Sequence, residues 1–403
     1  MRAMNYSTSW HQSIKEIPRE EWDRLAQPLA YPFLEWQWLA ALERSRCLGG
    51  ETGWFPRHLC LRQKDRIVAI APLFLKEHSW GEFVFDQEWA NLSYRLGVPY
   101  YPKLIGMSPF TPANGYRFLW GSGEDGREPC RLLLGAIDDF CADQGLAVCQ
   151  FLHVDESWKT LMTSLGMSEW LHHSLIWENR DYPSFEHFLR TLKSRQRKNI
   201  KRERRLLRER GLIFRIDRGH QAPAGHFRRI YDFYASTCLK FRNWSRYLNQ
   251  AFFLDLERHL ADRLLLITAF QREEPDRPVA MSFFVQKADR LYGRYWGCRA
   301  EYEFLHFETC YYQAIEWAIE HGIRFFDAGS GRAEHKRRRG FPARANFSLH
   351  RHYQPVLKTL WDQNIERINH LERGLIRQIN GPDEAPCSTG GGGTALPPRE
   401  EPR

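Results

Sequence analysis

The chain has 403 residues, of which 43% are hydrophobic and 14% aromatic, and its formal net charge is +9. This length suits two domains of about 150–200 residues each, and the apolar content supplies large cores and excludes global disorder. The longest apolar run, IVAIAPLFL, is too short to span a bilayer, and the N-terminal region lacks the apolar core of a secretory signal. Nine cysteines without any C-x-x-C spacing fit reduced thiols better than a disulfide framework or a zinc site. We therefore expect a cytoplasmic protein with no bound metal and no membrane span.

A strongly basic segment lies at residues 193–210, KSRQRKNIKRERRLLRER, which holds ten Lys or Arg against Glu203 and Glu209. Its residues favour helix, and Ile200 and Leu207 predict a thin apolar stripe along one side. Such a run is usually a solvated helix face. However, so many like charges on one helix repel one another and favour an anionic ligand. We expect this helix to bind nucleic acid or a phosphate-bearing substrate.

Two stretches of the chain resemble each other. RIVAIAPLFLK (66–76) and RPVAMSFFVQK (277–287) share Arg, Val, Ala and Lys at matching positions. Each follows another strand-like run, so each half is expected to contain a β-hairpin. An amphipathic helix, a glycine at its C′ position (Gly145 or Gly322) and a buried strand come next in both halves. The agreement in residues and in order favours the duplication of one domain-sized unit.

A hairpin, a helix and then a parallel strand form the core of the acetyltransferase-like (GNAT) fold, although other α+β folds share this order. Six longer motifs are similar to the predicted N-acyltransferases of the FemAB-like family, a tandem-GNAT group related to the peptidoglycan aminoacyltransferases. These motifs are YYPKL (100–104), SPFTPANGYR (108–117), SRQRKNIKRERR (194–205), DRLYGRYWGC (289–298), LHFETCYYQAIEWAI (305–319) and AEHKRRRGF (333–341).

The resemblance implies an α/β protein, with α+β mixed sheets, built from two tandem acyl-CoA N-acyltransferase (GNAT)-like domains. We place the N-terminal domain at residues 1–178 and the C-terminal domain, which contains the basic helix, at residues 179–380. The apolar spacing of residues 357–379 predicts a final amphipathic helix. The Gly- and Pro-rich tail, residues 381–403, is expected to be disordered.

The resemblance also implies transfer of an acyl or aminoacyl group from an activated ester or thioester to an amine, in peptidoglycan or cell-wall precursor metabolism. The donor would be acyl-CoA or aminoacyl-tRNA, with no permanently bound cofactor and no DNA partner. One alternative is a non-catalytic protein that binds RNA or an anionic precursor. Another is an acetyl-CoA-dependent small-amine acetyltransferase, but the R/Q-x-x-G-x-G/A pyrophosphate loop of ordinary GNAT enzymes is missing.

A glycine-rich turn followed by cations comes after the apolar run that ends at Asp327. Its glycines would expose backbone N–H groups to a phosphate, although the sequence is not a P-loop. The family usually has glycine where Ala333 stands, which reduces backbone freedom here. The structural alternative is an ordinary turn before a solvated basic helix. The donor-binding residues expected in this region are Gly329, Gly331, Glu334, His335, Lys336 and Arg339.

The segment LYGRYWG alternates as a strand does, so Tyr292, Arg294 and Trp296 would share one face, with Gly293 and Gly297 on the other. Glycine inside a strand indicates a bulge or a ligand lying against bare backbone. An acyltransferase needs a strand edge whose N–H groups polarise the acyl carbonyl. We therefore expect Tyr292 to be catalytic and Arg294 and Trp296 to contact the donor.

A helix is predicted from Leu305, with His306 and Glu308 in its first turn. Either side chain is a candidate for the base that takes a proton from the attacking amine. The structural alternative for Glu308 is a favourable interaction of its charge with the helix dipole. A zinc deaminase is excluded because the P-C-x-x-C segment that accompanies H-x-E in those enzymes is missing.

The remaining site predictions come from the resemblance. Arg195, Lys198 and Asn199 of the basic helix would contact the donor. Tyr100, Lys103 and Thr111 would line a cleft between the two halves.

Overall fold

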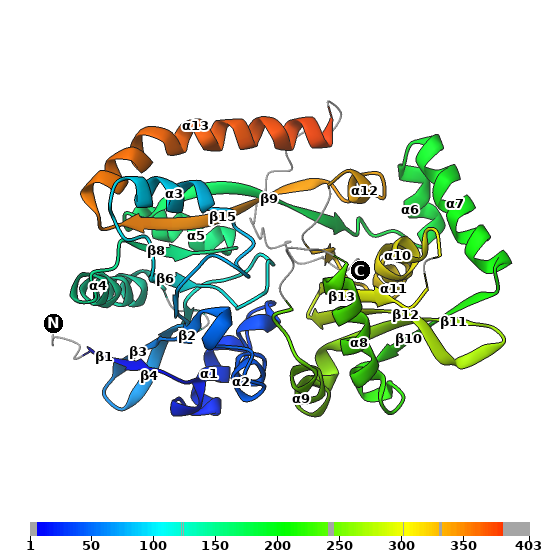
Figure 1. The fold of residues 1–403 in the computed structure, drawn as a ribbon, viewed down its shortest axis with the longest axis horizontal. Helices are drawn as coiled ribbons and strands as arrows, with labels where there is room; N and C mark the ends of the chain where they lie inside the picture. Colours follow the sequence, from blue (N-terminus) through cyan, green and yellow to red (C-terminus); the bar gives the residue numbers. More distant parts are fainter. Residues whose placement is uncertain are drawn as a thin grey trace, which may run out of the picture.

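The computed structural model describes residues 6–121, 123, 125–240, 246–300, 302–329 and 333–381. It consists of two lobes side by side, in each of which helices cover β-strands (Figure 1). The predicted disorder of the tail and the predicted role of Gly331 lie outside the described residues, apart from Gly381. Among the described helices, none combines the length and the apolar character needed to cross a membrane.

The first half contains the following helices and strands: β1 (Tyr6–His11), α1 (Arg19–Ala26), α2 (Trp36–Arg44), β2 (Trp54–Pro56), β3 (His58–Gln63), β4 (Arg66–Ala71), β5 (Phe74–Lys76), α3 (Gln87–Arg95), β6 (Lys103–Gly106), β7 (Leu119–Trp120), α4 (Arg127–Asp143), β8 (Val148–Phe151), α5 (Glu156–Ser164) and β9 (Ser168–Glu178).

The rest of the chain forms α6 (Phe185–Thr191), α7 (Ser194–Glu209), β10 (Leu212–Arg218), α8 (His226–Leu239), α9 (Gln250–Leu260), β11 (Leu264–Gln271), β12 (Glu274–Lys287), β13 (Arg290–Cys298), α10 (Leu305–Phe307), a π-helical turn (Glu308–Tyr312), α11 (Gln313–Glu320), β14 (Phe325–Asp327), α12 (Ala333–Arg337), β15 (Ala343–His352) and α13 (Pro355–Asn380). The predicted basic helix is confirmed as α7, and the predicted final helix is confirmed as α13.

The elements expected from the internal repeat are present in both halves. β3 and β4 form one antiparallel hairpin, and β11 and β12 form the other. Gly145 and Gly322 follow their helices with left-handed φ values of 63° and 66°. The next strands then complete the parallel pairs β6–β8 and β13–β14. The predicted fold class, a mixed α/β protein with two GNAT-like halves, is confirmed.

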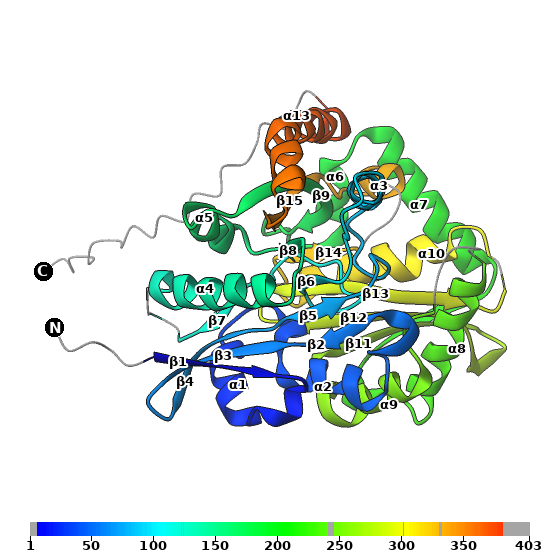
Figure 2. The ribbon, with the colours of Figure 1, turned by 60° about the vertical axis from the view of Figure 1, so that its left-hand side comes forward.

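The two repeats differ where Pro72 stands in the position of Phe283. Because proline has no N–H for the strand ladder, the first-half strand is divided into β4 and β5, whereas β12 is continuous. β4 therefore belongs to a four-stranded sheet, β1-β3-β4-β7, which α4 and α1 cover on opposite faces (Figure 2). β5 belongs to an eleven-stranded sheet in the order β10-β11-β12-β13-β14-β9-β15-β8-β6-β5-β2.

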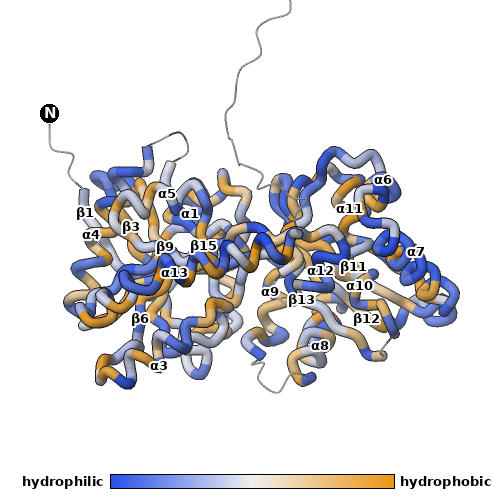
Figure 3. The backbone as a smooth tube through the Cα atoms, turned by 90° about the horizontal axis from the view of Figure 1, so that it is seen from above, coloured by the Kyte–Doolittle hydropathy of each residue, from blue (hydrophilic) through white to orange (hydrophobic). Residues whose placement is uncertain are grey.

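The eleven-stranded sheet runs through both halves because they share strands. β9 pairs with β14 at its C-terminal end and with β15 along the rest of its length. β15, which follows the second half in sequence, also pairs with β8 of the first half. α13 lies across β9 and β15 (Figure 3), and its Leu357 and Trp361 join a core with Val148 of β8. β15 and α13 thus pack with the first half, although they follow residue 178, where we placed the boundary between the two domains.

The backbones of β13 and α8 approach closely at Gly297. A Cβ atom there would lie 2.0 Å from the carbonyl oxygen of Phe233 in α8. Helix packing, rather than a ligand, therefore requires this glycine.

We predict that Gly297→Ala lowers the free energy of unfolding by about 1–3 kcal/mol, because the methyl group forces α8 away from the sheet. Gly135→Ala on the exposed side of α4 is the matched control, since nothing lies within 4 Å of the added Cβ. That control should gain up to about 1 kcal/mol from helix propensity. Urea unfolding of both variants measures the difference, and equal midpoints would contradict the close approach.

Candidate active site

The pairing between β13 and β14 stops after three residue pairs. Arg290–Tyr292 of β13 pair with Phe325–Asp327, where β14 ends, while β13 continues to Cys298. The sheet therefore has a gap beyond Tyr292 and Asp327. A cavity of about 1000 Å³ opens at this gap, and Gly293 and Gly329 are among its lining residues.

The cavity lies between the two halves of the molecule. Most of its wall comes from β12, β13, α8 and the α10 region of the second half, and Phe83, Phe110 and Pro112 come from the first half. The ring of Phe110 stacks on Tyr247, with 4.9 Å between centroids and 13° between planes. Stacking of this kind stabilises the contact of the two halves over the cavity.

The corresponding place in the first half is occupied by a side chain. β6 pairs in parallel with β8 up to Gly106, and a Cβ atom at Gly106 would lie 2.2 Å from the hydroxyl oxygen of Tyr116. Tyr116 is fully buried and donates a hydrogen bond to the carbonyl oxygen of Pro72 at 2.9 Å. A tyrosine therefore fills the space that is open in the second half.

Of the two alternatives for the glycines of β13, a bulge or a ligand against bare backbone, the structure shows a bulge at Gly293. Phe284 of β12 pairs with Gly293 and Phe283 pairs with Tyr295, so Arg294 is the extra residue. A bulge shifts the alternation of side chains by one position. The prediction that Tyr292, Arg294 and Trp296 share one face is therefore wrong. Tyr292 and Tyr295 pack into the same apolar core, whereas Trp296 packs into a different one.

Arg294 and Tyr292 have different surroundings. Arg294 lines the cavity and donates a hydrogen bond from its guanidinium to the carbonyl oxygen of Phe110 at 2.7 Å. Tyr292 is not among the lining residues, and its hydroxyl donates to the carbonyl oxygen of Ala30 at 3.3 Å. Burial raises the pKa of Tyr292 above its usual value. The hydroxyl predicted to be catalytic is thus a buried, protonated group directed at the first half.

His306 lines the cavity beside Trp296, with 4.8 Å between the ring centroids. Burial, together with the positive charges of Lys336 and Arg339, lowers the pKa of His306 to about 4. The imidazole is therefore neutral at pH 7 and can accept a proton. A second lining histidine, His335, lies 5.6 Å from the ring of Phe307.

Glu308 lies outside the cavity lining and is buried in an ion pair. Its Oε1 accepts a hydrogen bond from Arg204 of α7 at 3.0 Å and one from Gln313 at 2.7 Å. Burial raises the pKa of Glu308. This glutamate joins the π-helical turn to the inner face of α7.

Arg339 is not a cavity-lining residue but supports one, Phe307. Its guanidinium pairs with Glu203 of α7 at 3.0 Å and donates to the hydroxyl of Tyr312 at 2.7 Å. The same group lies 3.4 Å from the ring centroid of Phe307, which does line the cavity. Arg339, predicted to bind the donor, is thus placed against the outer side of Phe307.

The predicted anion-binding turn follows β14, and the structure describes its Gly329 and the residues from 333 onward. The N–H of Gly329 donates to Oδ1 of Asp327 at 2.8 Å, and Lys336 donates to the carbonyl oxygen of Gly329. Gly329 and Lys336 line the cavity, and burial lowers the pKa of Lys336 to about 8. Glu334 is exposed and pairs with Arg338 on the surface.

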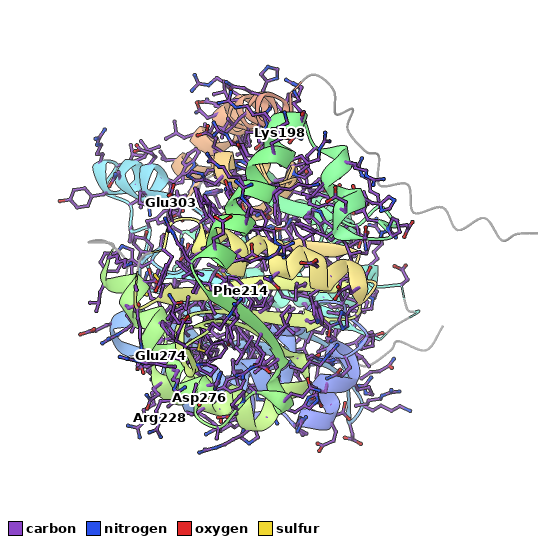
Figure 4. All side chains as sticks on the ribbon, turned by 90° about the vertical axis from the view of Figure 1, so that its right-hand side faces the viewer. Lys198, Phe214, Arg228, Glu274, Asp276 and Glu303 are labelled. Carbon is purple, nitrogen blue, oxygen red and sulfur yellow. The ribbon has the colours of Figure 1, made fainter. Side chains whose placement is uncertain are left out.

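Three predicted donor contacts lie on the outer surface of α7. Arg195, Lys198 and Asn199 are exposed and are not among the cavity residues. Figure 4 shows Lys198 on the outside of this helix. These three residues therefore lie apart from Arg294, Trp296 and His306, which were also predicted for the site and which line the cavity.

Tyr100 and Lys103 belong to a buried network behind the cavity. Lys103, fully buried, pairs with Glu82 at 2.8 Å and with Asp86 at 2.5 Å, and the hydroxyl of Tyr100 donates to Asp86 at 2.9 Å. Burial raises the pKa of Glu82 to about 7. Glu82 and Asp86 stand on either side of Phe83 in the chain, so this network holds the loop that carries a cavity residue.

Thr111 has a similar relation to the cavity. It is buried, and its hydroxyl donates to the carbonyl oxygen of Pro109 at 3.0 Å. Its neighbour Phe110 is the residue that lines the cavity.

Sequence reasoning missed several groups at the site. It did not select Phe83, Phe110 or Cys310, all of which line the cavity. It also passed over Asp327, which is buried at the gap with Oδ2 lacking a hydrogen-bond partner in the described part of the chain. Burial raises the pKa of Asp327. Its position in the sequence, as a single acidic residue between an apolar strand and a glycine-rich turn, could have identified Asp327 as a candidate site residue.

We predict that Lys103→Met lowers the free energy of unfolding by about 3–5 kcal/mol, because Glu82 and Asp86 lose their buried counter-charge. Lys358→Met is the matched control, since Lys358 pairs with Asp362 on the exposed surface of α13. It should change stability by less than about 1 kcal/mol. Guanidinium unfolding measures both, and similar small losses would show that the buried pair is not required.

The chain matches the sequence pattern of the FemAB-like family, described as peptidoglycan biosynthesis/recognition, over residues 13–386. No match was found among curated proteins. The solved structure of FemX is similar, with 12% identity, coverage of 89% of this chain and 99% of that chain, and a TM-score of 0.52. The C-terminal domain of a putative lysylphosphatidylglycerol synthetase from Agrobacterium fabrum has 9% identity, coverage of 88% and 97%, and a TM-score of 0.53. At such identities these likenesses concern the fold, whereas the pattern matches most of the sequence, so the chain belongs to the FemAB-like family.

Proposed function

We propose that this protein is an N-acyltransferase that moves an acyl or aminoacyl group from an activated ester or thioester to an amine. The observation that carries the proposal is the cavity at the gap between β13 and β14. A donor in this cavity would present its carbonyl to the backbone of the Gly293 bulge, where N–H groups can stabilise an oxyanion. The family to which the chain belongs supports an amine on a peptidoglycan precursor as the acceptor.

The transfer needs a neutral amine and an acceptor for its proton. The amine nitrogen attacks the carbonyl carbon, the new C–N bond forms, and the C–S or C–O bond of the donor breaks. We assign the base to His306, because it faces the cavity as a neutral imidazole. Glu308 forms an ion pair with Arg204 and is not among the residues that line the cavity.

The basic helix α7 supports an anionic donor such as acyl-CoA or aminoacyl-tRNA. Its Arg202 is exposed, and the guanidinium lies 5.9 Å from the ring centroid of Phe304. Phe304 lines the cavity, so the positive charge of α7 reaches the cavity rim. Arg195 and Lys198 continue this charge along the outer face of the helix, where phosphates of a long donor would bind.

We predict that His306→Ala lowers kcat by about 100-fold or more, because proton removal from the amine loses its base. Glu308→Gln keeps the shape of the buried side chain, and Arg204 retains its ion pair with Glu316 at 2.6 Å, so this variant should retain activity within a few-fold. The measurement is formation of acylated amine, by mass spectrometry, from acyl-CoA or aminoacyl-tRNA with peptidoglycan-precursor amines. Full activity of His306→Ala, with loss in Glu308→Gln, would reverse the assignment.

A pH profile tests the same assignment independently. Because the pKa of His306 is lowered to about 4, the imidazole stays unprotonated as the pH falls from 7 to 5 and becomes protonated only near pH 4. We predict that kcat/KM, corrected for protonation of the amine, has an acid limb near pH 4 that His306→Ala lacks. An acid limb near 6.5, the ordinary histidine value, would point to a different base.

A further inference from the structure

The cavity at the gap is much larger than an acetyl or alanyl group requires. Its volume of about 1000 Å³ is at the upper end for small-molecule sites. Among the described residues, 28 line the cavity, and twelve of these are Phe, Tyr or Trp. A small acyl group bound at Gly293 would itself contact only a small part of this aromatic surface.

Three of these aromatic residues have a positive φ angle, which is an unfavourable backbone conformation for a residue with a bulky side chain. Phe83, Phe110 and Phe304 have φ values of 60°, 59° and 71°, and all three line the cavity. They are three of the eight described non-glycine residues with positive φ. A bulky side chain disfavours this region, whereas glycine or asparagine adopts it easily. The chain nevertheless places a phenyl ring at the cavity wall in all three positions.

Core packing accounts in part for the rings of Phe110 and Phe304, which pack into apolar cores, but it does not account for Phe83. The ring of Phe83 is half-buried, and within the described residues it is not part of any of the protein's apolar cores. The chain nevertheless fixes it between Glu82 and Asp86, both paired with the buried Lys103. A costly buried network thus positions a ring whose free surface faces the cavity.

We propose that this cavity binds a long aliphatic acyl chain, so that the donor is a fatty-acyl thioester. The inference rests on the proposed function and specifies its substrate class. The same cavity contains Gly293 and Gly329 at the gap and the three strained phenylalanines. A chain attached to a carbonyl at the gap would therefore lie against their rings. The reaction remains an exchange of a C–S bond for a C–N bond, and the thiol leaves with the proton released by the amine.

Calorimetric titration of the full chain with CoA, acetyl-CoA, octanoyl-CoA and dodecanoyl-CoA tests the proposal without any amine present. Each added methylene should tighten binding by roughly three- to fourfold, as expected for burial in an apolar site. Equal affinities for acetyl-CoA and dodecanoyl-CoA would overturn the proposal. A parallel series of alkylamines identifies the source of the chain. Length dependence for the amines but not for the thioesters would assign the cavity to the acceptor and also overturn it.

Phe83→Gly removes one ring and relieves the backbone at the same time, so the fold should be retained. The affinity for dodecanoyl-CoA should fall about tenfold, the value for one lost phenyl contact, while the affinity for acetyl-CoA stays within twofold. Phe304→Gly is a second variant with the same expectation. Lys64→Gly is the matched control, because Lys64 has a φ of 56° in the exposed turn between β3 and β4.

Unchanged dodecanoyl-CoA affinity in both phenylalanine variants would contradict the acyl-chain site. This outcome is distinct from failure of the transferase proposal. A protein that shows the chain-length series but acylates no amine would retain the binding site and lose only the proposed reaction.

Discussion

The candidate site depends on the short pairing of β13 with β14. Three residue pairs join these strands, and the sheet then separates because β14 ends at Asp327. The bulge at Gly293 falls immediately after the last pair, so the strand changes its twist where the gap begins. In the first half, Tyr116 occupies the corresponding space. The duplicated architecture therefore provides two similar frameworks, and one of them has a cavity in which chemistry can occur.

Buried ion pairs hold the walls of this cavity in place. Glu203 and Arg204 on the inner face of α7 pair with Arg339 and Glu308, which support Phe307 and the π-helical turn. Lys103 does the same for the loop around Phe83. Removing one partner of such a pair leaves an uncompensated buried charge, which is strongly unfavourable. The charged motif residues Glu308 and Arg339 thus act as positioning groups, and aromatic side chains provide a large part of the surface that a ligand would touch.

Local patterns were enough to predict the hairpins, the basic helix α7, the glycines that end helices and the bulge near Gly293, because each depends on neighbouring residues. The shared strands β9 and β15 could not be predicted, since their partners are chosen by the packing of the whole sheet. The environment of Glu308 was equally inaccessible. Its partner Arg204 lies 104 residues away in sequence, and a motif does not reveal whether a side chain faces a cavity or a buried cation. Because of the bulge, Trp296 lies on the opposite face of β13 from Tyr292, whereas simple alternation places both on one face.

A crystal structure with a hydrolysis-resistant acyl-CoA analogue, in which a methylene replaces the thioester sulfur, tests the central claim most directly. We expect the acyl carbonyl oxygen within hydrogen-bonding distance of the β13 backbone between Gly293 and Tyr295, with the acyl chain between the two halves. An analogue bound only on the outer surface of α7, with the gap between β13 and β14 empty, would contradict it.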